Sequence, residues 1–442
     1  MFSKNKRKVL IIGAGGRDFH LFNTLYKNSN EVEVVAFLFT QIPRQTGKKY
    51  PYELAGNNYP NGIPIIDLKD LQKIIKENKI DEAILAFSDL TYNDLMKIAS
   101  WVLSLGIDFE IVSHLKTMLS SKKPVISICG VRTGVGKSTV TRYIVKILKE
   151  IGLKPIVIRH PMAYGNLLKK KVIKFENIED VLKNEDLSIE ERGEFYSLVK
   201  KGAIVYAGVD YEEVLRKAEK DGDIIIWDGG NNDVSFIKSD LYITVADATR
   251  PGQEIESFPG EINVRLSDVI IINKIENANK DSLENIIKNI KSINNKAEIT
   301  LANMKVIVDD PLMIKGKSVL VIEDGPTVTH GGKKFGAAYL AAKEYKAKEI
   351  VDPRLYAVGL IKEIYKEYAH LENVLPAVGY DEQQIRDFLS TVEKIPCDLI
   401  LYDIITGIGD IVSKYKPAIE VEYELIDINN KLKDIIISKF SK

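Results

Sequence analysis

The chain has 442 residues, which is too long for one ordinary hydrophobic core and predicts roughly two to four domains. Its 62 Lys and Arg residues balance 62 Asp and Glu residues, so no basic excess points to nucleic acid or to an anionic membrane. The two cysteines, Cys129 and Cys397, exclude a disulfide framework, and no apolar run is long enough to cross a bilayer. We therefore expect a cytoplasmic protein that binds neither nucleic acid nor membrane.

The first region alternates the patterns of strands and helices. Such alternation is typical of parallel βαβ units, so we predict an α/β protein that begins with a Rossmann-like domain over residues 1–121. The expected strands are Lys8–Ile12, Val32–Phe39 and Ala83–Phe87, and the expected helices are Leu68–Asn78 and Asn93–Leu105.

A polar, proline-terminated junction at Ser121–Pro124 precedes a second alternating region, which we predict to be a nucleotide-hydrolysing domain with a mainly parallel sheet over residues 122–317. Its strands end near Gly, Asp, Asn or Thr clusters, where the functional loops of such sheets lie. The expected strands are Val125–Cys129, Pro155–Ile158, Ile224–Trp227, Leu241–Ala246, Val269–Ile272 and Val306–Val308, with a helix over Ser138–Ile151.

Residues 318–442 form a third predicted region, a smaller C-terminal α/β region. Strands are expected at Val319–Ile322 and Leu399–Tyr402. The pattern leaves open whether this region is a domain of its own or an elaboration packed on the second.

The strongest motif follows the strand Val125–Cys129. Glycines there let successive backbone N–H groups curl around phosphate oxygens at a helix N-terminus, which is the geometry of a P-loop. In that geometry Lys137 reaches the β- and γ-phosphates and the Ser138 hydroxyl is a ligand of Mg²⁺. The predicted nucleotide-binding residues here are Gly130, Thr133, Gly134, Val135, Gly136, Lys137, Ser138 and Thr139.

The spacing of this loop departs from the strict P-loop motif, because Val131 stands where the first glycine is required and Gly130 leads instead. The longer spacing resembles dethiobiotin synthetase and the cobyrinic acid amide synthetases, in the class that also contains the deviant Walker A ATPases. Arg132 occupies the place of the extra lysine of those deviant loops. As a second catalytic cation it would stabilise charge on the transferred phosphoryl group, and in a homodimer it could do so across the subunit interface. The alternative is that Arg132 only pairs with a surface carboxylate.

An acidic partner for the P-loop is expected at Asp228. It ends the apolar strand Ile224–Trp227 and precedes Gly229 and Gly230, the pattern of a Walker B segment. A carboxylate at that position holds Mg²⁺ through water, so we predict a catalytic and metal-binding role for Asp228.

The segment Asn273-Lys274-Ile275-Glu276 resembles the Asn-Lys-x-Asp loop with which GTPases read guanine. Glu276 replaces the aspartate and adds a methylene, so both ATP and GTP stay open as the co-substrate. The alternative interpretation of Asn273 and Lys274 is an ordinary turn after a strand.

Several further residues are candidates for binding an anionic small molecule. Arg17 and His20 follow the glycine turn Gly13–Gly16, which lacks the third glycine of a dinucleotide fingerprint and therefore speaks against a redox enzyme. The remaining candidates lie in polar loops after expected strands, where plain turns are the alternative interpretation. These are His160, Arg250, Thr327, Thr329 and His330.

Taken together, the chain resembles the predicted GTPase family related to cyclic 2,3-diphosphoglycerate synthetase. The resemblance implies a P-loop core beside a Rossmann-like domain, and a reaction in which a nucleoside triphosphate drives cyclisation of a phosphorylated acid. The segments that carry it are Gly13–His20, Thr40–Pro43, Val131–Ser138, Arg159–Met162, Tyr206–Tyr211, Trp227–Asp233 and Asp324–Gly332.

We therefore expect an enzyme that uses Mg²⁺ and ATP or GTP to activate an anionic metabolite by phosphoryl transfer and then to ligate or cyclise it. A regulatory or chaperone-like GTPase with a protein partner is the alternative. The two extra domains favour the enzyme because they would exclude water from a substrate, whereas the Asn273–Glu276 segment favours the GTPase.

Overall fold

The computed structural model describes residues 6–39, 47–159, 165–187, 189–230, 233–329, 332–378, 382–404 and 408–441. The chain is an α/β protein that divides into two compact units, and each unit is built from separate segments. The first unit comprises Met1–Val135, Leu153–Lys174 and Tyr206–Ile299, and the second comprises Gly136–Gly152, Phe175–Val205 and Thr300–Lys442.

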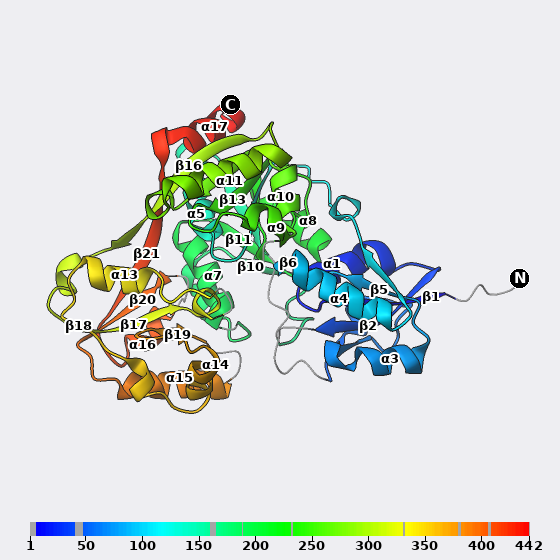
Figure 1. The fold of residues 1–442 in the computed structure, drawn as a ribbon, viewed down its shortest axis with the longest axis horizontal. Helices are drawn as coiled ribbons and strands as arrows, with labels where there is room; N and C mark the ends of the chain where they lie inside the picture. Colours follow the sequence, from blue (N-terminus) through cyan, green and yellow to red (C-terminus); the bar gives the residue numbers. More distant parts are fainter. Residues whose placement is uncertain are drawn as a thin grey trace, which may run out of the picture. The chain divides into compact units, whose positions relative to one another are not determined.

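The N-terminal part of the first unit is a small sheet with the strand order β3-β4-β2-β1-β5-β7, coloured blue to cyan in Figure 1. All neighbours pair in parallel except β3 and β4. The order β4-β2-β1-β5-β7 is that of doubly wound α/β sheets. The strands are β1 (Arg7–Ile12), β2 (Val32–Phe39), β3 (Lys49–Tyr50), β4 (Ile63–Asp67), β5 (Glu82–Leu85) and β7 (Asp108–Ile111).

Both faces of this sheet are covered, which explains the continuous apolar run in β1. Successive side chains of a strand point to opposite faces. Val9 and Ile11 accordingly pack into an aromatic cluster with Phe19, whereas Leu10 and Ile12 belong to a cluster on the other face. That second cluster includes residues of the two helices α3 (Leu71–Asn78) and α4 (Tyr92–Ser104).

A second, parallel set of strands completes the first unit, with the order β9-β12-β8-β13-β15. Because parallel strands place their carboxyl ends at one edge, the loops after these strands share that edge. The strands are β8 (Val125–Gly130), β9 (Pro155–Arg159), β12 (Ile224–Asp228), β13 (Leu241–Asp247) and β15 (Val269–Asn273). A short antiparallel pair, β6 (Leu90–Thr91) and β14 (Ser257–Phe258), lies in the same unit.

The remaining elements of the first unit are short or helical. They are α1 (Arg17–Leu21), η1 (Phe22–Tyr26), α2 (Tyr52–Ala55), η2 (Leu68–Asp70), η3 (His114–Lys116), α8 (Tyr211–Asp221), α9 (Gln253–Glu256), α10 (Gly260–Leu266), η5 (Ile275–Asn277) and α11 (Lys280–Ile293). Three strands contain the points where the chain passes from one unit to the other, namely β10 (Ile173–Phe175), β11 (Ile204–Ala207) and β16 (Glu298–Val308).

The second unit has a mixed sheet. β21 pairs antiparallel with β16 and parallel with β20, and β17 pairs in parallel with β18, β19 and β20. Its strands are β17 (Ser318–Asp324), β18 (Glu349–Ile350), β19 (Leu375–Ala377), β20 (Leu399–Asp403) and β21 (Ala418–Asp427). Its helices are α5 (Lys137–Glu150), α6 (Ile178–Leu182), α7 (Ile189–Lys200), η6 (Pro311–Met313), α12 (Gly325–Val328), α13 (Ala337–Glu344), η7 (Pro353–Leu355), α14 (Leu360–Glu367), α15 (Glu382–Lys394), α16 (Gly409–Val412), η9 (Ile428–Asn430) and α17 (Lys431–Phe440).

The strands expected from apolar runs are confirmed within one or two residues, apart from the short expected strand at Val306–Val308, which belongs to the longer β16. The strand β21 was not predicted. Its alternation of Ile419, Val421 and Leu425 with acidic residues is the period-2 pattern of a half-exposed strand and not a continuous apolar run. The domain boundaries near residues 121 and 317 remain predictions. Within the described ranges, none of the helices combines the length and the apolar character that a bilayer crossing requires.

Candidate functional site

The predicted P-loop begins where β8 ends. Gly134 has φ 81° and Gly136 has φ 104°, left-handed values that favour glycine, so this pair of glycines is required by the backbone. Gly136 precedes α5, whose first residue is Lys137. The sequence-predicted strand, loop and helix are therefore all present, with the helix N-terminus at the predicted lysine.

Hydrogen bonds from neighbouring elements hold the start of the loop. The Asn263 amide donates to the Gly130 carbonyl (3.1 Å), and the Ser257 hydroxyl donates to the Val131 carbonyl (2.7 Å). Gly260 makes this approach possible, because a Cβ atom there would lie 2.3 Å from the Val131 carbonyl oxygen. Ser257, Gly260 and Asn263 were not predicted, and a single Ser, Gly or Asn in a loop carries no recognisable motif.

The ends of β13 and β15 support the middle of the loop. The Asn273 amide donates to the Val135 carbonyl (2.9 Å), the Lys274 ammonium donates to the Gly134 carbonyl (2.7 Å), and Arg250 donates to the Thr133 carbonyl (3.1 Å). These contacts use the polar groups of Asn273, Lys274 and Arg250 to fix the backbone of the P-loop.

Asp247 anchors two of these cations. It forms ion pairs with Lys274 and with Arg250, and its side chain is only 1% exposed. Burial alone would raise the pKa of Asp247, but Lys274 and Arg250 reverse the shift and lower it to about 2. Asp247 is therefore ionised at neutral pH and keeps Lys274 and Arg250 directed at the loop.

These contacts bear on the predicted guanine-reading segment. Asn273 is fully buried and Lys274 nearly so, and both bind the loop, while Glu276 is exposed on the turn η5 that follows β15. Loop support therefore accounts for Asn273 and Lys274 without a base, and a role of Glu276 in base recognition remains a prediction.

Arg132 pairs with a carboxylate from the N-terminal sheet. Its Nε atom lies 2.9 Å from Oδ1 of Asp89, and both side chains are about one-quarter exposed. The Thr133 hydroxyl donates to Oδ2 of the same carboxylate (2.8 Å), and the Thr133 N–H donates to Oδ1 (3.3 Å). Thr133, predicted to bind phosphate, thus presents both donors to Asp89 in this structure.

Asp228 lies at the carboxyl end of β12, in register with Ile128 of β8, beside the strand that leads into the P-loop. It is fully buried, and its Oδ2 atom lies 2.6 Å from Arg159 Nη1. Within the described residues its Oδ1 atom has no hydrogen-bond partner. Arg159 was not predicted as a site residue, and the predicted neighbour His160 lies outside the described residues.

The surroundings of Asp228 bear on the predicted Mg²⁺ site. A buried carboxylate oxygen without a partner fits a divalent cation, which favours oxygen ligands and commonly takes one or two carboxylates together with phosphates. No group of three or more acidic, His or Cys residues in the described ranges forms a metal cage. Asp228 therefore fits Mg²⁺ as one ligand of a site that also needs the nucleotide, and the role of Ser138 remains a prediction.

The second unit contributes the helical end of the P-loop motif. Lys137, Ser138 and Thr139 occupy the first turn of α5. Thr139 is buried, and its hydroxyl accepts a hydrogen bond from Arg142 (3.3 Å), which also donates to the Tyr423 carbonyl of β21 (3.1 Å). Thr139 thus takes part in fixing α5 to β21, in addition to any role in nucleotide binding.

Arg17 and His20 lie in the interior of the first unit. Arg17 is 5% exposed and donates to the Thr117 hydroxyl (2.8 Å), while His20 stacks on Phe236 with ring centroids 4.5 Å apart. Burial lowers the pKa of Arg17 to about 10, against the opposing effect of Asp233. Burial, with Arg17 nearby, lowers the pKa of His20 to about 3, so His20 is neutral at physiological pH.

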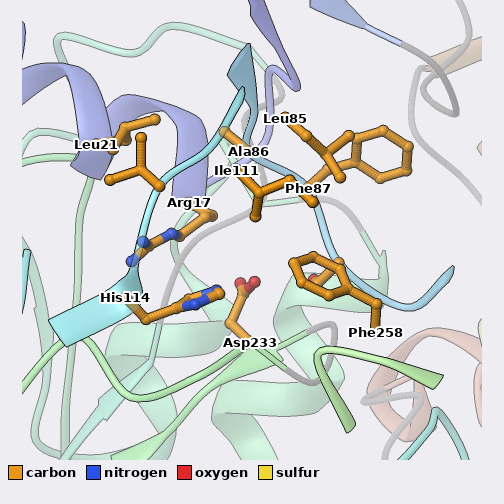
Figure 2. Close-up of a pocket in the computed structure, with 11 residues that line it drawn as sticks. Arg17, Leu21, Leu85, Ala86, Phe87, Ile111, His114, Asp233 and Phe258 are labelled. Carbon is orange, nitrogen blue, oxygen red and sulfur yellow. The ribbon is translucent and has the colours of Figure 1, made fainter. Parts of the chain in front are cut away.

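Figure 2 shows the small cavity beside Arg17, with Asp233 pointing into it. Its volume is about 10 Å³, room for about one water molecule, so a metabolite would have to open it. A role of Arg17 and His20 in binding substrate therefore remains a prediction that needs a rearrangement. The lining residues are Arg17, Leu21, Leu85, Ala86, Phe87, Ser88, Ile111, Val112, His114, Asp233 and Phe258.

The glycine turn before α1 holds a carboxylate of its own chain. Asp18 accepts hydrogen bonds from the N–H groups of Gly15 (2.8 Å), Gly16 (3.1 Å) and Phe19 (2.7 Å). Those are the donors that a pyrophosphate would use at such a turn. The contacts support the prediction against a dinucleotide site, since Asp18 fills the position of the anion.

The candidates of the C-terminal region are described only in part. His330 lies outside the described residues, and of Thr327 only the backbone, within α12, is described. The Thr329 hydroxyl donates to the Gly325 carbonyl (2.7 Å) at the end of α12. In this structure the Thr329 hydroxyl therefore binds the backbone of α12.

A buried acidic pair lies close to that segment. Glu323 is fully buried and accepts the Tyr339 N–H (2.7 Å) at the start of α13. Because Ile322 pairs with Tyr402, Asp403 is the neighbour of Glu323 on the adjacent parallel strand. Burial, and then the Asp403 carboxylate, raise the pKa of Glu323 to about 8.

This shift predicts how stability depends on pH. The folded protein binds a proton on Glu323 up to about pH 8, whereas a free glutamate loses it near 4.5, so stability falls as pH rises between these values. Glu323→Gln removes the titration, and its Tm should rise relative to wild type as the pH goes from 5 to 8. Glu344→Gln, at the exposed end of α13, is the matched control. A constant Tm difference for Glu323→Gln across this range would contradict the shift.

Comparison with known proteins places the chain among P-loop synthetases. The model of the cyclic 2,3-diphosphoglycerate synthetase P-loop domain matches residues 202–302. Arginine synthetase ArcE of Thermococcus kodakarensis is 49% identical over 437 residues, which cover 99% of this chain and 97% of the relative. Cyclic 2,3-diphosphoglycerate synthetase of Thermococcus sibiricus is 31% identical over 59% of this chain and 64% of its own. Among solved structures, LpxK of Aquifex aeolicus in complex with ATP matches 78% of this chain and 95% of its own, with a TM-score of 0.43 and 14% identity.

Proposed function

Since the chain belongs to the cyclic 2,3-diphosphoglycerate synthetase family of P-loop enzymes, we propose that it is a nucleoside-triphosphate-dependent synthetase whose product is arginine. One observation carries this proposal. The likeness to arginine synthetase extends over nearly the whole of both chains, and so includes all three sequence-predicted regions. The likeness to a cyclic 2,3-diphosphoglycerate synthetase at 31% identity covers only 59% of this chain.

The chemistry of the product defines the reaction. Arginine differs from the ureido amino acid of the same carbon chain, citrulline, by a nitrogen in place of the ureido oxygen. We propose that the ureido oxygen attacks the γ-phosphorus and the nucleoside diphosphate leaves. Ammonia then attacks the ureido carbon, and phosphate departs with the former ureido oxygen. The guanidinium keeps the proton, so one triphosphate, one ureido acid and one ammonia yield arginine, diphosphate and phosphate.

The residues of the P-loop would supply the phosphoryl-transfer step by position and charge. Lys137 would bind the β- and γ-phosphate oxygens, and the loop N–H groups, held by Asn273, Lys274 and Arg250, would surround them. Asp228, with Ser138, would hold Mg²⁺, which when bound neutralises charge on the phosphates.

A regulatory GTPase is the weaker alternative. The sequence feature that favoured it was Asn273–Glu276, and the contacts of Asn273 and Lys274 with the loop carbonyls account for that pair without guanine. Both ATP and GTP therefore belong in the first assay.

The proposal predicts that arginine forms only when nucleoside triphosphate, citrulline, ammonium and Mg²⁺ are all present. Arginine is measured by amino-acid chromatography and phosphate by ³¹P NMR, and one phosphate should appear for each arginine. Parallel reactions with 2,3-bisphosphoglycerate in place of citrulline test the cyclisation reaction. Conversion of the bisphosphoglycerate, with no arginine from citrulline, would refute the proposed product and assign the chain the other activity of its family.

A further inference from the structure

Asp89 joins the N-terminal sheet to the P-loop at three points. The residue lies four positions after β5. Its Oδ1 atom is 2.9 Å from Arg132 Nε and accepts the Thr133 N–H at 3.3 Å, and its Oδ2 atom accepts the Thr133 hydroxyl at 2.8 Å. One carboxylate thus binds two adjacent residues of the loop, Oδ1 contacting both and Oδ2 contacting Thr133, although Asp89 and Thr133 are 44 positions apart in the sequence.

The backbone of Asp89 is held in an uncommon conformation. Its φ angle is 66°, in the left-handed region that few residues other than glycine adopt. Such a conformation persists only where the surroundings determine it, and it occurs often at functional sites. The contacts with Arg132 and Thr133 are part of the surroundings that fix the carboxylate here.

The way in which Asp89 binds Arg132 matters for catalysis. The carboxylate pairs with Arg132 at Nε, the inner donor of the guanidinium. A guanidinium recognises phosphate through paired donors, and its planar group gains specificity when its orientation is fixed. A carboxylate on the terminal nitrogens would occupy the donors that phosphate needs, whereas a carboxylate on Nε fixes the plane and leaves them available.

We propose that Asp89 is a positioning residue that orients Arg132 as the second cation of phosphoryl transfer, so that the N-terminal sheet completes the nucleotide site within one chain. Asp89 itself touches neither nucleotide nor substrate. The inference rests on the part of the proposed function in which the P-loop cleaves a triphosphate, and not on arginine as the product. It replaces the sequence-based alternative in which Arg132 reaches across a dimer interface.

A double-mutant cycle on triphosphate cleavage tests the inference. Asp89→Ala and Arg132→Ala should each lower kcat by about 10- to 100-fold with KM changed less than about 3-fold, because the cation acts mainly in the transition state. The double variant should be no slower than Arg132→Ala, since Asp89 acts through Arg132. Asp89→Asn, which keeps a neutral acceptor for Thr133 and Arg132, should recover part of the rate.

The matched control is Glu77→Gln. This carboxylate lies on α3 and is exposed, and its removal should leave kcat unchanged. Tm is measured for every variant. If Asp89→Ala fails to fold, the cycle is run with Asp89→Asn, which keeps the shape of the side chain, and Arg132→Lys, which keeps the charge but lacks Nε and the planar guanidinium.

Three outcomes would overturn the inference. Losses of kcat that multiply in the double variant would mean that Asp89 and Arg132 act independently. Faster turnover or tighter triphosphate binding by Asp89→Ala would mean that the carboxylate competes with phosphate. Mixing Arg132→Ala with Lys137→Ala subunits should restore no activity, and restored activity would contradict action within one chain.

The same cycle also separates this inference from the proposed function. The affinity of each variant is measured for a non-hydrolysable ATP analogue and for ADP, and the ratio of the two affinities is compared across the cycle. This binding measurement needs no acceptor substrate. When Asp89 orients Arg132, the protein should bind the triphosphate analogue more tightly than ADP. Both single variants should lower this preference to the same value. A chain that cleaves triphosphate without forming arginine would refute the product while this cycle still decides the role of Asp89.

Discussion

Replacing Lys137 by alanine is expected to lower kcat for triphosphate cleavage by at least about 100-fold while the protein stays folded. Lys137 is the first residue of α5, directly after the left-handed Gly136. At that position its ammonium would neutralise charge that develops on the β- and γ-phosphate oxygens, and no neighbouring residue of the loop is a lysine.

The measurement is steady-state phosphate release with Tm as the control for folding. Lys146→Ala is the matched variant, because Lys146 lies on the same helix and is exposed. It should keep the wild-type rate. Normal turnover by Lys137→Ala would refute the assigned phosphate-binding loop, whereas loss of rate in both variants would indicate damage to α5.

The second large effect concerns stability. Arg159→Ala should destabilise the protein by about 3–5 kcal/mol, because it leaves the carboxylate of Asp228 buried without its cation. Arg159 is 5% exposed and Asp228 is fully buried, and their atoms Nη1 and Oδ2 lie 2.6 Å apart. Water therefore offers Asp228 little compensation when the arginine is removed.

Thermal unfolding measures this effect, and the expected fall in Tm is more than about 6 °C. Lys183→Ala is the control, because its ion pair with Glu179 is exposed on both sides and such a pair contributes about 0–1 kcal/mol. Arg159→Met combined with Asp228→Leu should recover much of the stability, since an apolar pair replaces a buried ion pair at little cost. A fall in Tm for Arg159→Ala no larger than that for Lys183→Ala would show that the buried pair does not stabilise the fold.

The parts of the site that lie on continuous motifs could be predicted from the sequence. A strand that is covered on both faces is an apolar run, so β8, β12 and β15 were recognisable, and the polar residues that end them were recognisable as well. Asp228 and Asn273 were placed at the strand ends where the structure has them.

Residues that act from another element could not be predicted in this way. Asp89 follows Phe87 and Ser88 in a loop whose sequence carries no recognisable motif. Its contact with Arg132 depends on the fold, in which β5 pairs with β1 and the loop after β5 reaches Arg132. Gly260 is needed because the Val131 carbonyl, just after β8, lies against it, which depends on how α10 packs. Distances between elements decide both cases, and local sequence patterns carry no information about them.

The interpretation of Asn273 and Lys274 shows a different limit. The segment was recognised, but sequence alone left open whether these side chains read a base or form a turn. Their contacts with the Val135 and Gly134 carbonyls show neither role, because the two side chains support the phosphate-binding loop. A motif fixed the position of these groups, and only the structure identified their partners.

The central claim is that the triphosphate activates an acceptor oxygen by phosphoryl transfer before ligation. It is tested most directly with citrulline labelled with ¹⁸O in the ureido group, in a reaction with triphosphate, Mg²⁺ and ammonium. Mass spectrometry and ³¹P NMR then locate the label. The account predicts one ¹⁸O atom in each inorganic phosphate that is released with arginine. Label recovered in nucleoside monophosphate or in water, or phosphate without label while arginine forms, would contradict it.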